Sequence, residues 1–314
     1  MRQISSRRAG GKGRSFRGLL RLMVAPLLLV SAFSVSAFTG STSAAAKTTA
    51  PPKGSPWYLS LGDSLAQGVQ SDGVQPPDGG SIITDSGYVD DLYQSGLTAR
   101  PHLQLMKLGC PGETSSSLVL GAGATPPSPC TYAEGSQLAA AAAFIATHRV
   151  AFITMDIGAN DVDGCIAAPD PQACVVAALP VMAHNVGLTV GTLEAAIAGS
   201  GQKTRIFGMN YYDPFLAAWL TGPAGQLQAQ QTEVLTEALN ITLQGVYGHF
   251  GVKVANVQRA YQTSNFDIVQ PIGLPVNVLE ICINTWMCSE GNIHANDVGY
   301  QVIADAFLKL SAVL

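Results

Sequence analysis

A serine that follows a short apolar run is the first candidate for chemistry in this chain. Tyr58 to Leu61 have the character of a buried strand, and the run ends abruptly at Gly62-Asp63-Ser64. A serine just beyond the carboxyl end of a strand lies where open α/β sheets bind their ligands. If a helical turn begins there, its unpaired N–H groups point at whatever Ser64 attacks. Taken alone, the tripeptide fits an ordinary polar turn equally well.

Further polar motifs lie at the ends of other apolar segments. Gly112 stands in Gly-Cys-Pro-Gly-Glu-Thr, Asn160 is followed by Asp161, and His294 lies in Asn-Ile-His-Ala-Asn-Asp. Parallel strands bring their carboxyl ends to one edge of a sheet, so Ser64, Gly112 and Asn160 can converge there. Each motif also has a plain structural interpretation, since Asn-Asp pairs shape turns and cap helices, and glycine suits turns. Histidine alone is no sign of catalysis either, because four more are present: His102, His148, His184 and His249.

The elements that must position these residues alternate between strand and helix patterns. Apolar runs predict strands at 58–61, 103–108, 150–157, 204–209 and 252–257. Apolar residues at helical spacing predict helices around 182–197, 235–246 and 298–310, the last with Asp297 as a plausible N-cap, and an Ala-rich helix at 138–147. This alternation predicts an α/β fold with a mostly parallel sheet and helices on both faces. The long segments 66–86, 112–134 and 258–296 are expected to be irregular and functional.

The N-terminal segment has the features of an export signal. Residues 1–21 carry seven basic side chains and no acidic one, and an apolar stretch to Phe33 is followed by Val35-Ser36-Ala37. We expect 1–37 to be a secretory signal peptide, 38–56 a flexible linker and 57–314 the folded domain. A transmembrane anchor is the alternative, but the stretch is short and is interrupted by Pro26. Whether export follows the general or the twin-arginine route is open.

Charge and cysteine content restrict the partners. The leader removes seven of the 17 Lys and Arg residues and none of the 21 acids, so the exported chain has a net charge near −11. Such a charge argues against nucleic acid or an anionic membrane surface as the main partner. All six cysteines lie in the exported part, and an even number in a secreted chain predicts three disulfides. No CxxC, zinc-finger or HExxH spacing occurs, so a metal site has little support.

The four motifs together resemble the four blocks of the SGNH (GDSL-type) serine hydrolases. They occur in the family's order, and the resemblance extends from Trp57 to the C-terminus. Segments 281–288 and 294–300 are similar to those of secreted actinobacterial-type esterases and lipases of this group. The resemblance implies a flavodoxin-like three-layer fold with a five-stranded sheet, and an esterase or lipase that needs no cofactor and no metal. It implies a secreted enzyme that acts on a small-molecule or lipid ester, and we expect a monomer with no membrane span after signal cleavage.

The resemblance also implies roles for the four residues. Ser64 would be the nucleophile and His294 its general base. The oxyanion would be held by the backbone N–H groups of Ser64 and Gly112 and by the side-chain amide of Asn160. Gly112 suits this role because the absence of a Cβ lets substrate approach the backbone. We assign Asp161 to loop structure.

One position departs from the family pattern. Most members have an Asp two or three residues before the histidine, where this chain has Asn292 and Gly291. The group that orients His294 is therefore expected to be either Glu290 or, preferably, a backbone carbonyl near Gly291. The missing Asp also leaves an alternative function, a catalytically silent member of the fold that binds lipid or glycan at the cell surface.

The pattern of the secreted relatives implies disulfides between sequence neighbours. These would be Cys110–Cys130, Cys165–Cys174 and Cys282–Cys288, each closing a loop beside one of the motifs. The ester itself is not identified by the sequence. The segment 210–216, with Trp219 nearby, could form an apolar wall for the acyl group or could equally well pack under a loop.

Overall fold

A five-stranded parallel sheet forms the centre of the fold. The computed structural model describes residues 53–75 and 80–310. The sheet strands, in spatial order, are β4 (Gln104–Lys107), β1 (Trp57–Gly62), β5 (Val150–Asp156), β6 (Arg205–Met209) and β7 (Lys253–Ala255). All neighbouring pairs run parallel. The five strands expected from the apolar runs are thus confirmed, with small shifts at their ends.

The strand order places the functional motifs at one edge of the sheet. In chain order the sheet reads second, first, third, fourth and fifth strand, which is the flavodoxin-like order. Ligands of such sheets bind where the order reverses, beside the first and third strands. Here these strands are β1 and β5, so Ser64 and Asn160 follow the two strands that flank the reversal. β1 is buried on both faces, as its largely apolar run predicts for a central strand.

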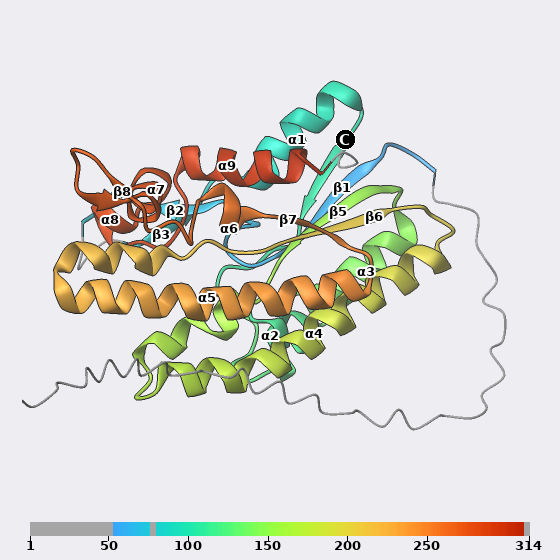
Figure 1. Cartoon of the computed structure of the whole chain (residues 1–314). Coiled ribbons are helices and arrows are strands. Elements are labelled where there is room, and N and C mark those ends of the chain that lie inside the picture. The colour runs from blue at the N-terminus through green and yellow to red at the C-terminus, as the bar shows by residue number, and fades with distance from the viewer. Residues whose placement is uncertain (1–52, 76–79, 311–314) are drawn as a thin grey trace, which may run out of the picture. The chain divides into compact units, whose positions relative to one another are not determined.

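Helices cover both faces of the sheet (Figure 1). The helices that form the two outer layers are α1 (Tyr88–Ala99), α3 (Gln137–Thr147), α4 (Pro171–Gly199), α5 (Pro223–His249) and α9 (Asp297–Leu308). Figure 1 shows α1 and α9 together on one face and α3, α4 and α5 on the other, in agreement with the contacts between these helices. The three layers share one apolar core.

Short elements fill the connections after the strands. They are β2 (Val69–Ser71), β3 (Ser81–Ile83), α2 (Ser115–Leu120), α6 (Val257–Ala260), β8 (Ile268–Val269), β9 (Leu274–Pro275), α7 (Val276–Asn284) and α8 (Met287–Glu290). The 3₁₀ helices are η1 (Gly121–Gly123), η2 (Ala159–Asp161), η3 (Asp163–Ala167) and η4 (Pro214–Thr221). The segments expected to be irregular therefore contain short strands and helices. Helix α1 was not among the expected elements.

The start of α9 differs from the expectation in one residue. Asn296, not Asp297, is the N-cap, and its side-chain oxygen accepts a hydrogen bond from the Gly299 N–H at 3.0 Å. The Asp297 carboxylate instead accepts a hydrogen bond from Gln70 on β2, at 2.7 Å. This bond connects the last helix to the segment that follows the Gly62-Asp63-Ser64 motif.

Three disulfides close loops in the described part of the chain. They join Cys110 to Cys130, Cys165 to Cys174 and Cys282 to Cys288, which is the sequence-neighbour pairing that the resemblance implies. The expected signal peptide and most of the expected linker lie outside the described residues. Among the described residues, one helix, α4, is long and apolar enough by length and composition alone to cross a membrane. One side of α4 is buried in the core shared with the sheet.

Candidate active site

Ser64 lies in a tight turn directly after β1. Its carbonyl oxygen accepts hydrogen bonds from the N–H groups of Gln67 and Val69, at 3.2 and 3.1 Å. Gly62 enters this turn with φ of 140°, and a Cβ there would lie 2.2 Å from the Asp156 carbonyl oxygen. Only glycine can take this conformation at this distance from the neighbouring strand. The Gly62-Asp63-Ser64 motif is therefore needed for the shape of the turn.

A buried aspartate at the end of β5 stabilises this turn through hydrogen bonds. The Asp156 side-chain oxygen Oδ2 accepts the backbone N–H groups of Asp63 and Ala66, both at 3.2 Å. Its Oδ1 accepts a hydrogen bond from the Tyr88 hydroxyl at the start of α1. Asp63 in turn accepts the Leu65 N–H at 2.9 Å. The backbone on both sides of Ser64 is thus held by two carboxyl groups.

These two carboxyl groups share one buried site. Asp63 and Asp156 are almost completely removed from solvent. Burial, and then the nearby Asp63, raise the pKa of Asp156 well above its ordinary value, and burial also raises the pKa of Asp63. Because two such close carboxyls cannot both ionise cheaply, their proximity favours a proton bound to the pair.

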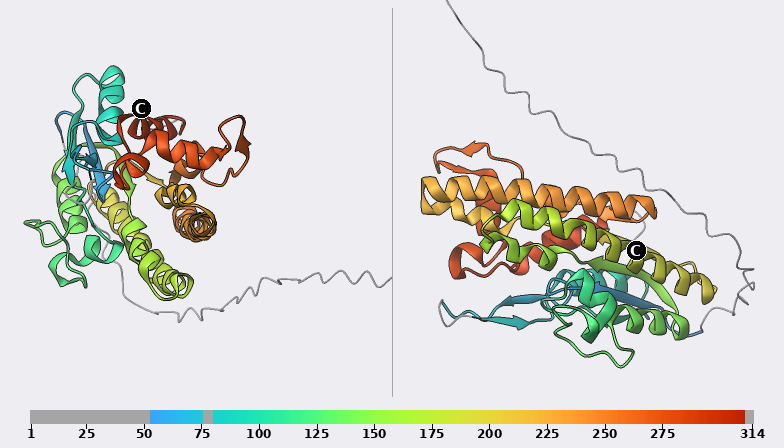
Figure 2. Two further views of the ribbon diagram at one scale, coloured as in Figure 1. Left: turned by 90° about the vertical axis from the view of Figure 1, so that its left-hand side faces the viewer. Right: turned by 90° about the horizontal axis from the view of Figure 1, so that it is seen from below.

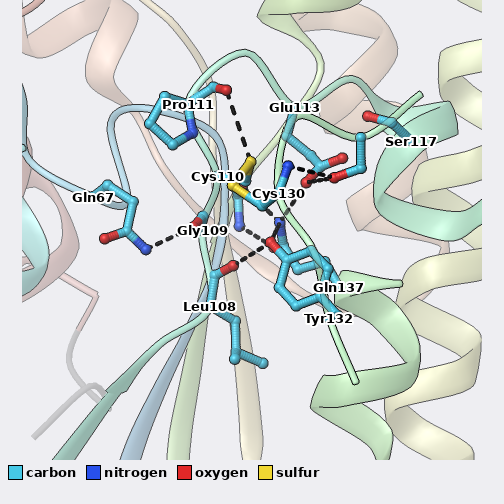
Figure 3. Close-up of a disulfide and its surroundings, with 12 residues drawn as sticks. Gln67, Leu108, Gly109, Cys110, Pro111, Glu113, Ser117, Cys130, Tyr132 and Gln137 are labelled. Atoms are coloured by element: carbon cyan, nitrogen blue, oxygen red, sulfur yellow. Dashed lines mark hydrogen bonds between the residues drawn. A yellow bond between two sulfur atoms is a disulfide. The ribbon is translucent and has the colours of Figure 1, made fainter. Parts of the chain in front are cut away.

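The Gly112 motif is attached to the turn that contains Ser64 by Gln137, which is drawn in Figure 3. The Gln137 side chain accepts the Gly62 N–H at 2.7 Å and donates to the Gly62 carbonyl at 3.0 Å. It also donates to the buried Glu113 carboxylate at 3.2 Å. The disulfide from Cys110 closes the same loop beside Gly112 (Figure 3). Gly112 itself has φ of 80°, a conformation that favours glycine.

Asn160 and Asp161 attach the third motif to the second. The Asn160 Nδ2 group donates to the Glu113 carbonyl at 3.0 Å. The Asp161 carboxylate accepts the N–H and the hydroxyl of Ser115 at the start of α2, at 2.8 and 2.6 Å. Asp161 therefore has the structural role expected for it. The second hydrogen of the Asn160 amide remains available to a ligand.

The backbone groups expected to form the oxyanion hole are free to do so. Within residues 53–75 and 80–310, the N–H groups of Ser64 and Gly112 donate no hydrogen bond to a protein acceptor. Unpaired donors of this kind, next to a serine hydroxyl, are what an oxyanion hole requires.

His294 has its ring orientation determined by Asn292. The Asn292 oxygen Oδ1 lies 2.7 Å from the ring nitrogen Nδ1 and also accepts the backbone N–H of His294 at 3.0 Å. The Asn292 amide nitrogen donates to the Gly80 carbonyl at 3.1 Å and to the Ser81 hydroxyl at 2.9 Å. A carbonyl can only accept, so these contacts establish which end of the amide is oxygen. Nδ1 must then carry the hydrogen, which leaves Nε2 as the free base.

The group expected to orient His294 is therefore corrected. The Glu290 carboxylate is bonded to the Ser71 hydroxyl on β2 and not to the imidazole. The Gly291 carbonyl makes no hydrogen bond to the ring among the described contacts. Asn292 takes the position because Gly291, with φ of 64°, turns the chain after α8 so that the next side chain faces back toward His294.

The loop that carries His294 is bonded on several sides. The Trp286 N–H donates to the His294 carbonyl at 3.0 Å, and the Tyr212 hydroxyl donates to the Ile293 carbonyl at 2.9 Å. Burial lowers the pKa of His294 to about 4. The imidazole is consequently neutral, and able to accept a proton, at neutral pH.

Ser64, Asn160 and His294 line one cavity. Its empty volume is about 730 Å³, its mouth included. Tyr211, Tyr212, Pro214 and Phe215 form part of its wall, so four residues of the segment 210–216, for which an acyl wall and packing under a loop were equal alternatives, line the cavity, whereas Trp219 does not. Asp163 also lines it, and burial, followed by three nearby aspartates, raises its pKa to about 7. No hydrogen bond joins Ser64 to His294 in this geometry; such contacts commonly tighten only in the substrate complex.

Sequence reasoning missed Asp156, Gln137 and Asn292. Asp156 had a usable signal, because it is a carboxylate at the end of an otherwise apolar strand run. Gln137 gave none, since a glutamine at the start of an Ala-rich helix is unremarkable in sequence. Within the described chain, no group of three or more His, Cys, Asp or Glu side chains is arranged to hold a metal ion.

Comparison with known proteins identifies the family. The model of the GDSL-like Lipase/Acylhydrolase family matches residues 60–302. The chain belongs to this family. No curated protein sequence matches it.

Solved structures share the fold at low sequence identity. The lipase Lip_vut3 from goat rumen metagenome has a TM-score of 0.51 and 15% identity, with 82% of this chain and 98% of that chain covered. A protein from Parabacteroides merdae named as a GDSL-like lipase has a TM-score of 0.50 and 12% identity, with 85% and 100% covered. At such identities the likeness concerns the α/β three-layer fold.

Proposed function

We propose that this protein is a secreted serine hydrolase that cleaves carboxylic esters through an acyl-enzyme intermediate. The observation that carries the proposal is the cavity that Ser64 and His294 share, together with the Asn292 contact that leaves Nε2 of His294 as a base. Membership of the GDSL-like family supports ester hydrolysis as the reaction class.

Each step of the reaction has a residue to perform it. His294 Nε2 takes the proton of the Ser64 hydroxyl as Oγ bonds to the ester carbonyl carbon. The N–H groups of Ser64 and Gly112 and the Asn160 amide stabilise the oxyanion. His294 then donates the proton to the leaving alcohol as the C–O bond breaks. Water, activated by His294, hydrolyses the acyl-Ser64 ester in the same way and releases the acid.

Mutation of the catalytic pair tests this mechanism. Ser64→Ala and His294→Ala should each abolish hydrolysis of p-nitrophenyl butyrate. The double variant should be hardly slower than either, because the two residues act as a unit. Asn160→Ala should lower kcat less, by about 10²–10³-fold, because it removes one oxyanion donor of three. Steady-state kinetics on variants with native circular dichroism measure this. Full activity of folded Ser64→Ala would show that Ser64 is not the nucleophile, whereas a wild type without hydrolytic activity would leave the silent lipid- or glycan-binding function in its place.

Export is part of the proposal and has its own test. Three disulfides and the basic, then apolar, N-terminal segment support an oxidising destination outside the cytosol. The secreted chain should begin at Phe38, directly after the Val35-Ser36-Ala37 signature. N-terminal sequencing of protein collected from the culture medium checks this. Recovery of an intact leader on a membrane-bound protein would contradict it.

A further inference from the structure

A second apolar hollow lies beside the cavity that contains Ser64. It is a groove between the first part of α4 and the middle of α5, with an empty volume of about 1050 Å³. Its apolar lining consists of Pro171, Val175, Val176, Leu227, Val234, Leu235 and Ala238. We call this hollow the α4–α5 groove.

Two side chains separate the groove from the catalytic cavity. Val175 on α4 and Leu235 on α5 line both hollows. The two spaces therefore adjoin at a wall that these two residues help to form. Figure 2 shows α4 and α5 lying side by side, as their contacts also indicate, so this wall is the seam between the two helices.

The chemistry of the groove suits a hydrocarbon. Its one ionisable residue is Asp170 at the rim, whose carboxylate caps α4 by accepting the Ala173 N–H at 2.9 Å. The other polar residues that line it are neutral glutamines. Leu227 and Val234 are each 63% exposed. Burial of methylene groups in a neutral apolar groove of this kind is favourable, because it removes apolar surface from water.

The surrounding helix surface is also poor in charge. From Pro171 to Leu193, α4 contains no Asp, Glu, Lys or Arg. A surface helix of a soluble domain normally presents a charged outer face. An uncharged outer face next to a catalytic cavity fits contact with an apolar substrate.

We propose that the α4–α5 groove binds the distal part of a long fatty acyl chain whose ester carbonyl lies at Ser64. The chain passes from the catalytic cavity between Val175 and Leu235 and ends on Leu227 and Val234. The proposal rests on the ester hydrolysis proposed above and names its substrate class, esters of long-chain fatty acids. Each methylene placed in the groove should favour the bound state by about fourfold.

The test compares a short and a long ester on matched surface variants. The Leu227→Gln/Val234→Gln double variant changes exposed residues of the groove and leaves the catalytic cavity intact. The control is Ile241→Gln, a residue of the same helix that is 59% exposed and lies outside the groove. Substrates are p-nitrophenyl butyrate and p-nitrophenyl dodecanoate, both kept below the concentration at which they form micelles.

We expect kcat/KM of the double variant to fall roughly tenfold on the dodecanoate and to stay unchanged on the butyrate. Ile241→Gln should match the wild type on both esters. An unchanged dodecanoate rate in the double variant, or an equal loss in Ile241→Gln, would overturn the groove as the acyl site. A change of oligomeric state in the double variant, measured by light scattering, would also overturn it, because the groove would then be a contact between copies. If the wild type hydrolyses neither ester, the proposed function itself fails.

Discussion

At the scale of single residues, the amide of Asn292 stands where a carboxylate would be expected. It performs the positional task of a triad acid, because its oxygen holds Nδ1 of His294. It does not supply a negative charge to offset the burial of the imidazolium. The low pKa of His294, about 4, follows from burial with no such compensation. A neutral orienter therefore predicts an enzyme that remains active in acid.

The pH profile tests this prediction. The acid limb of kcat/KM should lie near pH 4 in the wild type, because only below this pH is the base protonated. Asn292→Asp places a carboxylate beside the ring, which favours the imidazolium and should move the limb upward by about one to two pH units. Activity on p-nitrophenyl butyrate, measured over the pH range in which the folded state persists, gives the acid limb of the wild type and that of Asn292→Asp.

A control separates charge from position in this experiment. Asn292→Ala removes the hydrogen bond without adding charge, so kcat should fall while the acid limb stays low. Identical limbs in wild type and Asn292→Asp would mean that the side chain at position 292 does not contact the imidazole in the active enzyme.

At the scale of elements, Asp156 joins β5, the nucleophile turn and the start of α1. It is fully buried and bonds the N–H groups of Asp63 and Ala66 and the hydroxyl of Tyr88. Loss of its side chain would leave the Ala66 N–H and the Tyr88 hydroxyl unpaired in the core, whereas the Asp63 N–H would keep its bond to the Asp156 carbonyl. Unpaired buried groups are costly, whereas an isosteric partner can keep them satisfied.

Two substitutions at Asp156 should therefore differ strongly. Asp156→Ala should lower the free energy of unfolding by about 2–4 kcal/mol. Asp156→Asn should change it by less than about 1 kcal/mol, because the amide oxygen can keep both N–H bonds and the amide nitrogen can donate to the Tyr88 hydroxyl oxygen. Urea denaturation at neutral pH, followed by circular dichroism, measures both. A large loss in Asp156→Asn would show that the carboxyl is ionised in the folded protein.

The elements also show which parts of the fold could be predicted from sequence patterns. The strands were predictable because each lies in a segment rich in apolar residues, and the central strands β1 and β5 are almost entirely buried. The β2–β3 hairpin was not, because its strands have three residues each and are held by distant partners. These include the Tyr300 hydroxyl on the Val69 carbonyl and Glu290 on Ser71.

Separation along the sequence also explains which parts of the candidate site could be predicted. Ser64, Asn160 and His294 could be placed because strand ends and the last helix bring them to one edge of the sheet. The role of Asn292 could not, because it depends on Gly80 and Ser81, about two hundred residues earlier in the chain, which determine how its amide is turned. No local pattern contains that information.

At the scale of the whole molecule, the disulfides stabilise loops beside the site without entering the cavity. The residues that line the cavity, all within the described chain, include no cysteine. The three bonds close loops with sequence separations of 20, 9 and 6. A disulfide restricts the unfolded chain more when the loop is longer, and each is worth about 2–4 kcal/mol. Their effect should thus fall on stability first and on chemistry only through unfolding.

Removal of single disulfides should reveal this order. Cys110→Ala/Cys130→Ala should lower the melting temperature most and Cys282→Ala/Cys288→Ala least, because loop-closure entropy for separations of 20 and 6 differs by roughly 1 kcal/mol. For a domain of this size, 1 kcal/mol corresponds to about 2–4 °C. Thermal denaturation gives the order, and kcat on p-nitrophenyl butyrate at 25 °C, where each variant should remain folded, gives the chemistry. A variant that loses most of its kcat while its unfolding curve is unchanged would show that its disulfide holds the catalytic groups directly. Such a result would be most informative for Cys110–Cys130, because this disulfide lies next to Gly112.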